Sequence, residues 1–176
     1  HSYSHLYKLP TTGLRFFTVY GPWGRPDMAL YLFTKAIFED KPIKVFNYGK
    51  MKRDFTYVTD LVQAIERLIH VAPPRMDQRE TFCQSPHDSL SNVAPFRVVN
   101  IGNSEPVELM NYIGAIENSL GIKAKKKFLP MQAGDVPATF ADTRLLKDLI
   151  GVVPSKKVED GVAEFVKWYK GYYSTK

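Results

Sequence analysis

The chain contains a single cysteine, Cys83, among its 176 residues. It can therefore form neither an internal disulfide nor a metal site built from several cysteines. Cys83 lies in the polar, proline-interrupted stretch RETFCQSPHD, which is a poor setting for a catalytic nucleophile. No apolar run approaches the ~20 residues that a membrane span needs, and no signal peptide is evident. We expect a cytoplasmic protein with no membrane partner.

The sequence also lacks repeats and a strongly basic helix. Its net charge of +6 and pI near 9.3 favour an anionic partner, such as nucleic acid, an acidic surface or a phosphorylated small molecule. The basic residues are scattered, and the densest runs are 50–53 and 125–127. Since no helix shows a Lys/Arg stripe with interleaved aromatics, we expect no nucleic-acid partner. A basic, non-catalytic nucleic-acid-binding domain stays open as the alternative of another class.

Strand and helix signals alternate along the chain. Stretches rich in β-branched and aromatic residues predict strands, and apolar residues at helical spacing predict helices. The strands are expected at 12–19, 42–49, 53–58, 96–102 and 123–130. The helices are expected at 28–38, 59–71, 106–120, 143–150 and 156–170. The alternation predicts an α/β fold with at least some parallel pairing, built around one ordinary core.

The boundaries of these helices follow from capping residues. Residues 72–95, with four prolines, are expected to form a long surface loop. The expected caps are Thr59 or Asp60, Ser104 with Pro106, and Asp142 at helix starts, and Gly121 and Gly151 at helix ends.

Four blocks, in order, carry a resemblance to a known family. They are LRFFTVYGPWGRPDMA, VFNYGKMKRDFTYVTDLVQAI, RVVNIGNSEPVELM and MQAGDVPATFADT. Together they resemble the C-terminal portion of nucleotide-sugar epimerases of the extended short-chain dehydrogenase family, most closely the UDP-glucuronate 4-epimerases. The resemblance implies a Rossmann-like α/β fold: strands 12–19 and 96–102 belong to the Rossmann sheet, and a smaller domain binds substrate. It also implies that residues 1–176 are a C-terminal fragment whose N-terminal NAD-binding half is absent.

The family's catalytic elements are missing from this sequence. No Rossmann glycine fingerprint is present, the only G-x-x-G being Gly21 to Gly24. The catalytic Tyr-x-x-x-Lys of the family would precede residues 1–7, which look like the tail of its helix. Tyr31 with Lys35 and Tyr172 with Lys176 have that spacing, but chance supplies such pairs in a chain with ten tyrosines. We therefore expect that this chain contains no catalytic residue and is inactive as a fragment. The full-length enzyme is expected to be a possible homodimer.

The resemblance assigns the cofactor and sugar contacts to the first block. The backbone near Phe16 would meet the nicotinamide of NAD, and the Thr18 hydroxyl would face the sugar. The alternative for Thr18 is an ordinary strand residue. Arg25, in a Gly/Pro loop, would bind the sugar carboxylate together with Thr18 because a guanidinium grips a carboxylate bidentately. The alternative is a solvated loop charge. Met28 would lie among the substrate-binding residues.

The nucleotide contacts fall in the second block. Lys44, Val45 and Phe46 resemble the strand that packs against uracil, and Phe46 can alternatively be a core residue. Arg53 would bind the diphosphate. Its alternative is a salt bridge with Asp54 or another acid.

The last block supplies two further residues. Asp135 can accept hydrogen bonds from ribose hydroxyls, and Gln132 sits where galactose-type epimerases carry an arginine. Four histidines complete the inventory of possible ligands, and their spacing forms no metal set, so no metal is expected. They are His1, His5, His70 and His87.

These residues point to the substrate-binding portion of an NAD-dependent UDP-sugar 4-epimerase. The reaction implied by the resemblance interconverts UDP-glucuronate and UDP-galacturonate, for surface polysaccharide, by transient oxidation at C4. An epimerase, dehydratase or decarboxylase for another nucleotide sugar remains the alternative within the family.

Overall fold

The computed structural model describes residues 1–81 and 85–173, so Cys83 and Lys176 lie outside the described residues. Among these, strands form three small sheets with mostly parallel pairing, which confirms the predicted α/β class. The parallel pairs are β1 (Thr11–Phe16) with β5 (Phe96–Ile101), β2 (Thr18–Tyr20) with β4 (Lys52–Tyr57), and β3 (Ile43–Val45) with β7 (Lys126–Phe128). An antiparallel strand, β6 (Pro106–Glu108), lies on the other edge of β4.

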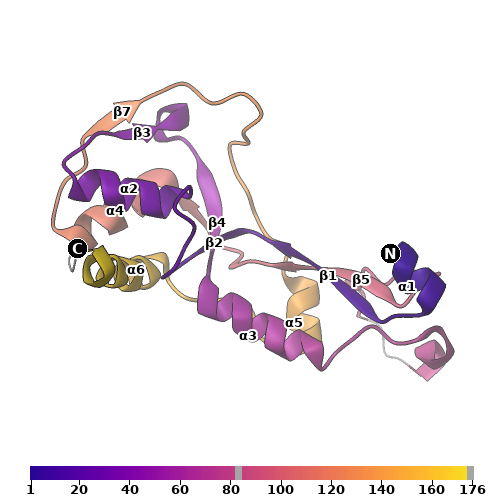
Figure 1. Cartoon of the computed structure of the whole chain (residues 1–176). Coiled ribbons are helices and arrows are strands. Elements are labelled where there is room, and N and C mark those ends of the chain that lie inside the picture. The colour runs from indigo at the N-terminus through magenta and orange to yellow at the C-terminus, as the bar shows by residue number, and fades with distance from the viewer. Residues whose placement is uncertain (82–84, 174–176) are drawn as a thin grey trace.

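The buried apolar residues form two hydrophobic clusters. Figure 1 shows the helices of the larger cluster at one end of an elongated molecule and those of the smaller cluster in its middle. The larger cluster is built by α2 (Ala29–Phe38), α4 (Leu109–Leu120), α6 (Val158–Tyr173), β3 and β4. The smaller cluster is built by α3 (Val58–Ile69), α5 (Arg144–Ile150) and β5, with β1 beside it. The N-terminal α1 (Ser2–Tyr7) lies at the β1/β5 end. The sheet β2–β4–β6 joins the two groups.

The expected strand at 12–19 is in fact two strands with different partners. β1 ends at Phe16, and the Phe17 N–H donates to the Ile101 carbonyl at 3.3 Å. β2 follows after one residue, but it pairs with β4 and not with β5. The prediction of one strand was wrong because the change of partner depends on distant segments. This break places Phe16 and Thr18 where the two clusters meet.

The expected helix start at Ser104 and Pro106 was also wrong. Residues 106–108 are a strand, and α4 begins at Leu109. β4 holds this segment extended: Lys52 and Glu108 are register partners, and their side chains form an exposed ion pair at 3.2 Å. The Leu109 N–H then donates to the Met51 carbonyl at 2.8 Å. Pairing with β4 therefore outweighs the helix-start signal of Ser104 and Pro106.

The predicted helix caps have mixed outcomes. Gly121 and Gly151 end α4 and α5 in the left-handed conformation, with φ of 74° and 73°, as predicted. The Asp142 carboxylate accepts the Arg144 N–H at 3.1 Å, so the expected contact at the start of α5 forms, although Thr143 is the cap residue. Neither Thr59 nor Asp60 caps α3.

The cap of α3 is Tyr57, without a side-chain hydrogen bond. The Asp60 carboxylate instead accepts the N–H groups of Ser155 and Lys156, both at 2.9 Å. These two hydrogen bonds connect α3 to the segment before α6.

The expected loop at 72–95 is largely irregular but includes a short 3₁₀ helix, η2 (Met76–Thr81). Its later part runs beside β5: the Ser89 hydroxyl donates to the Val98 carbonyl at 2.6 Å and accepts the Val98 N–H at 2.9 Å. Asp88 and Arg97 form an ion pair at 3.5 Å with both side chains buried. In the described part of the chain, no helix has the length and apolarity to cross a membrane.

Candidate functional site

A hollow lies where β1 and β2 end, at the junction of the two clusters. Its walls bring together four residues that the sequence placed at the sugar and cofactor: Phe16, Thr18, Arg25 and Met28. Its empty volume is ≈ 770 Å³, including the part open to solvent. Arg25 is the one charged residue among the described residues that line it. An apolar hollow at the carboxyl ends of parallel strands, with one guanidinium, suits an anionic ligand.

The loop between β2 and α2 forms one wall of this hollow. Gly21 has φ of +142°, and a Cβ there would lie 2.7 Å from the Val58 side chain, so only glycine fits. Gly24 donates its N–H to the Gly21 carbonyl at 3.1 Å. A second turn follows, in which the Met28 N–H donates to the Arg25 carbonyl at 3.2 Å. Two consecutive turns therefore fix the position of Arg25.

Trp23 fastens this loop to α6. Its ring centroid lies 5.2 Å from those of Trp168 and Tyr172. Trp23 has φ of 62°, a conformation that costs about 1–2 kcal/mol for a residue with a Cβ. The aromatic contacts offset this cost, although 72 % of Trp23 remains exposed.

Arg25 makes an ion pair within its own loop. Its Nε donates to Asp27 Oδ1 at 3.0 Å and its Nη2 to Asp27 Oδ2 at 2.5 Å. The hydrogen bond from Arg25 lowers the pKa of Asp27 below its ordinary value. Both side chains are exposed, so the sequence alternative of a solvated loop charge describes the chain as it stands. The pair nevertheless leaves Arg25 in the wall of the hollow.

The three residues expected at uracil lie in and just after β3. Lys44 is exposed, whereas the Val45 side chain is completely buried in the larger cluster. The Val45 carbonyl accepts the Leu129 N–H at 2.9 Å. The side chain of Val45 therefore packs in the core, and only its backbone can contribute to a site. Phe46 is half-buried and opens the short helix η1 (Phe46–Gly49).

Arg53 and Asp135, predicted separately, contact each other. The Arg53 Nη2 donates to Asp135 Oδ1 at 2.7 Å, and its Nη1 donates to the Lys52 carbonyl at 2.9 Å. Only 19 % of the Arg53 side chain is exposed. The sequence left open a salt bridge between Arg53 and an acid, and this is the arrangement observed. Gln132 is exposed nearby, and its carbonyl accepts the Asp135 N–H at 3.3 Å.

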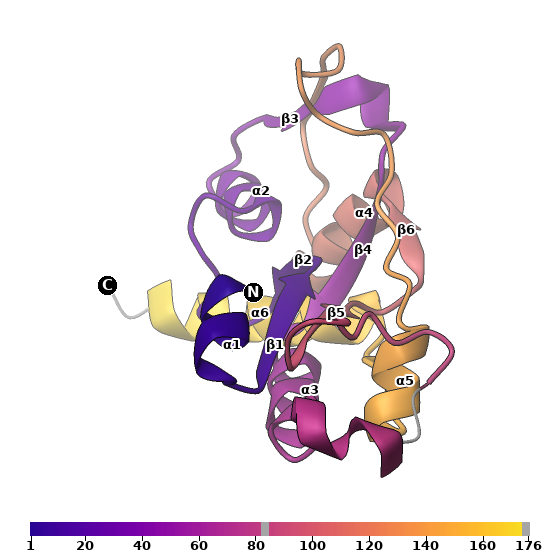
Figure 2. The ribbon, with the colours of Figure 1, turned by 90° about the vertical axis from the view of Figure 1, so that its right-hand side faces the viewer.

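Asp54 is a buried residue whose role the sequence did not indicate. Its carboxylate is fully buried and accepts three backbone N–H groups: Asn103 at 2.8 Å, Ser104 at 3.0 Å and Ala141 at 2.9 Å. Figure 2 shows the segment between β7 and α5 descending past β4 and β6 to reach this point. Asp54 thus fixes the segment that carries Asp135. An acidic residue inside a predicted strand, between Arg53 and Phe55, was the available signal.

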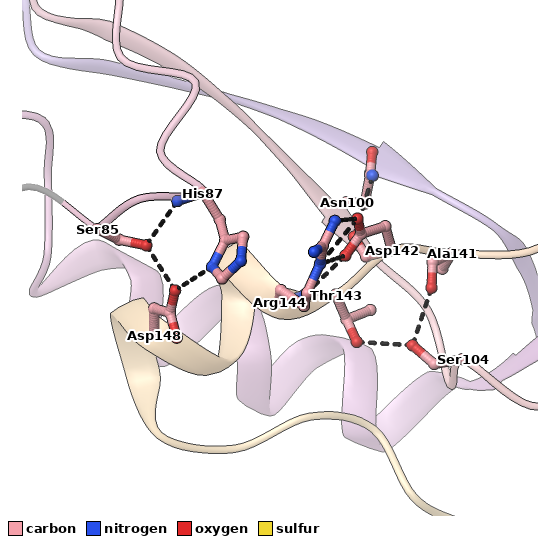
Figure 3. Close-up of polar contacts among 9 residues, drawn as sticks. All are labelled: Ser85, His87, Asn100, Ser104, Ala141, Asp142, Thr143, Arg144 and Asp148. Atoms are coloured by element: carbon pink, nitrogen blue, oxygen red, sulfur yellow. Dashed lines mark hydrogen bonds and ion pairs between the residues drawn. The ribbon is translucent and has the colours of Figure 1, made fainter.

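Ser104 adds a second anchor for the same segment. Its hydroxyl donates to the Ala141 carbonyl at 2.9 Å and lies 2.6 Å from the Thr143 hydroxyl, as Figure 3 shows. The chain also approaches closely at Gly102, where a Cβ would lie 2.3 Å from the Ala141 Cβ. The turn after β5 and the segment before α5 are therefore closely packed.

A Ser–His–Asp cluster beside α5 does not have the geometry of a nucleophile and base. Ser85 donates its hydroxyl hydrogen to Asp148 Oδ2 at 2.5 Å, and His87 Nδ1 lies 2.8 Å from the same oxygen. Figure 3 shows that both side chains address the carboxylate and that the serine hydroxyl does not contact the imidazole ring. Within residues 1–81 and 85–173, no group of three His, Cys, Asp or Glu could hold a metal ion.

Tyr31, one of the two chance Tyr-x-x-x-Lys matches, has a different partner. Its hydroxyl donates to the Tyr173 hydroxyl at 2.8 Å. This hydrogen bond and, secondly, burial raise the pKa of Tyr31 to about 12. Such a group stays protonated near neutral pH and is a poor base.

Comparisons with known proteins find similar sequences and structures. Residues 1–77 match the NAD dependent epimerase/dehydratase family. The chain is 59% identical over 173 residues to an uncharacterized 37.6 kDa protein of Escherichia coli O111:H-, covering 98% of this chain and 51% of that protein. It is 54% identical to a probable UDP-glucuronate 4-epimerase of Rhizobium meliloti, covering 98% of this chain and 50% of the relative.

A solved structure gives the same picture. The UDP-glucuronic acid 4-epimerase of Bacillus cereus, in complex with UDP-glucuronic acid and NAD, matches with a TM-score of 0.79 and 30% identity. The match covers 98% of this chain and 49% of that one. The chain thus spans about half the length of the curated and solved relatives it matches.

Proposed function

We propose that this chain belongs to the NAD-dependent epimerase/dehydratase family. In this proposal it supplies the UDP-sugar-binding part of a 4-epimerase acting on UDP-glucuronate and UDP-galacturonate. The observation that carries the proposal is the hollow with its single described charge, Arg25, beside Thr18. A sugar carboxylate entering an apolar hollow requires a charged partner with two aligned donors, which a guanidinium provides.

The hollow assigns a task to each of its residues. Arg25 would orient the sugar by its carboxylate, and the Thr18 hydroxyl would hydrogen-bond to the sugar. Backbone groups near Phe16, at the carboxyl end of β1 and in the wall of the hollow, would receive the nicotinamide carboxamide. NAD, when bound, supplies the hydride acceptor for oxidation at C4. Met28 would close the hollow over the sugar.

The second group of residues would hold the nucleotide. Arg53, with its small exposed fraction, can direct charge at the diphosphate while Asp135 keeps its guanidinium in place. Arg53 and the Val136 N–H both donate to Asp135 Oδ1, so Oδ2 would accept a hydrogen bond from a ribose hydroxyl. Lys44 and Phe46 would border the base, and Gln132 would lie at the rim. This division gives firm binding of the nucleotide and an adjustable hold on the sugar.

The proposed reaction also needs a base, and the described residues that line the hollow include no carboxylate, histidine or lysine. Tyr31, with its raised pKa, is unsuited to the task. We therefore propose that the chain is inactive alone and that β1 and β5 belong to the sheet of an NAD-binding half. Exposed apolar residues at this end support the assignment, because such surfaces are normally covered. They are Tyr3, Leu6, Tyr7, Leu9 and Phe16. They are also compatible with a homodimer of the complete enzyme.

The test compares an acidic and a neutral sugar in the complete protein that carries this sequence. Arg25→Ala should lower kcat/KM for UDP-glucuronate about tenfold or more relative to UDP-glucose, because only the acidic sugar loses a charge-assisted partner. Equal losses for both sugars would reassign the protein to another nucleotide sugar. A salt-sensitive gel shift with nucleic acid, without thermal stabilisation by UDP, would favour the nucleic-acid-binding alternative.

A further inference from the structure

The turn that carries Arg25 also delivers a carboxylate to it. Arg25, Pro26, Asp27 and Met28 form a β-turn closed by the Met28 N–H and the Arg25 carbonyl, with proline at its favoured second position. Pro26 fixes its own φ and restricts the residue before it. The backbone therefore holds Asp27 close to Arg25, and little further ordering is needed for their side chains to pair.

In the ion pair between Arg25 and Asp27, the guanidinium donates from the same edge that it would offer to a ligand carboxylate. Asp27 accepts from Nε and from Nη2, one bond to each carboxylate oxygen. This parallel two-bond arrangement is the one by which arginine binds carboxylates and phosphates. Of the two residues, Arg25 belongs to the described lining of the hollow and Asp27 does not. Asp27 thus engages Arg25 from outside the binding space.

We propose that Asp27 is an internal carboxylate that occupies Arg25 in the unliganded protein and is exchanged for the substrate's carboxylate on binding, an inference that rests on the proposed function. The exchange replaces one carboxylate by another, so the guanidinium keeps a charged partner throughout. Asp27 returns to water easily because 62 % of its side chain is already exposed. Asp27 is thereby a specificity-determining residue.

Acidic and neutral sugars would respond differently to this exchange. A hydroxymethyl group makes only neutral hydrogen bonds, which are weaker than charge-assisted ones, so it would not displace Asp27. Arg25 then stays paired and contributes nothing to a neutral ligand. A sugar carboxylate competes directly with Asp27, and its net affinity is lowered by the strength of the internal pair. Asp27 therefore weakens binding of the acidic sugar and speeds its release.

The experiment measures dissociation constants of UDP, UDP-glucose and UDP-glucuronate by titration calorimetry in the complete protein. Asp27→Asn should tighten UDP-glucuronate about two- to fivefold, the range of an exposed ion pair, and leave the other two unchanged. Asp40→Asn is the matched control. Asp40 forms an exposed ion pair with Lys125 at 2.5 Å, so the variant makes the same charge change in another exposed pair.

A double variant assigns the effect to Arg25. In an Arg25→Ala background, Asp27→Asn should no longer change the affinity for UDP-glucuronate. Weaker binding of UDP-glucuronate by Asp27→Asn would show that Asp27 positions Arg25, and an effect equal to that of Asp40→Asn would show only a change in net charge. Either result overturns the exchange. Failure of the parent protein to bind UDP at all would instead refute the proposed function.

Discussion

Asp54 should be the most sensitive polar residue for the stability of this chain. In Asp54→Asn, the side chain keeps its shape but has one acceptor oxygen in place of two. The amide oxygen can best replace Oδ2, which accepts from Ser104 and Ala141. The amide NH₂ then faces the Asn103 N–H, which donates to Oδ1 in the native chain. One buried N–H is left without an acceptor, and two charge-assisted bonds become neutral.

The magnitude follows from these three bonds. An unsatisfied buried donor costs about 1–3 kcal/mol, and weakening of the other two adds about 1 kcal/mol. We therefore expect a loss of about 2–4 kcal/mol in the free energy of unfolding, a large part of the ~5–15 kcal/mol typical of a domain. The urea midpoint should fall by about 1 M or more.

The assay is urea unfolding of the chain followed by circular dichroism. Asp40→Asn is the control, since its exposed ion pair should contribute less than about 1 kcal/mol. Thr139→Val gives an intermediate case, because it removes only the acceptor of the Asp54 N–H at 3.1 Å and should cost about 1 kcal/mol. If Asp54→Asn lowers the midpoint no more than Asp40→Asn does, the buried anchor described above is not a stabilising feature.

Three further outcomes are expected. Gly161→Ala should destabilise the chain by about 1–3 kcal/mol, because its Cβ would lie 2.4 Å from the Tyr20 hydroxyl. Gly114→Ala, with open space around its Cβ, should stabilise the chain by up to about 1 kcal/mol because alanine favours the helix α4. Thermal melts of both variants test this. Burial raises the pKa of Glu117, but hydrogen bonds, first from Lys126, outweigh it and lower the pKa to about 2. Its stabilisation should be complete above its ordinary value of 4.5 and decline as pH falls toward 2, so Glu117→Gln should flatten that part of the stability curve. The purified chain should show no epimerase turnover with NAD and UDP-glucuronate, and measurable turnover would contradict the proposed division of the enzyme.

The sequence predicted the order and kind of most elements because hydrophobic periodicity is local. The α2 helix, expected at 28–38, runs from Ala29 to Phe38. The errors lie where a distant partner decides the conformation. β4 takes β2 on one edge and β6 on the other, which splits the expected strand at 12–19 and holds residues 106–108 extended. Asp60 likewise serves the backbone of Ser155 and Lys156 instead of its own helix.

The candidate site was predictable only through the family resemblance. Periodicity and composition gave no reason for Phe16, Thr18 and Arg25 to share one hollow. The contact between Arg53 and Asp135 joins residues 82 positions apart, and no local pattern contains it. Asp27 follows Arg25 by two positions in the sequence, yet its role depends on a turn geometry that residue types alone do not specify.

The aromatic contact between the Arg25 loop and α6 gives the chain a built-in optical probe. The sequence has two tryptophans, and Trp23 and Trp168 lie side by side with ring centroids 5.2 Å apart. Intrinsic fluorescence excited at the indole band therefore originates from this one contact. Because Trp23 lies two residues from Arg25, a ligand that moves the loop should change the emission. The same emission reports poorly on the β1/β5 end, where unfolding would pass unseen.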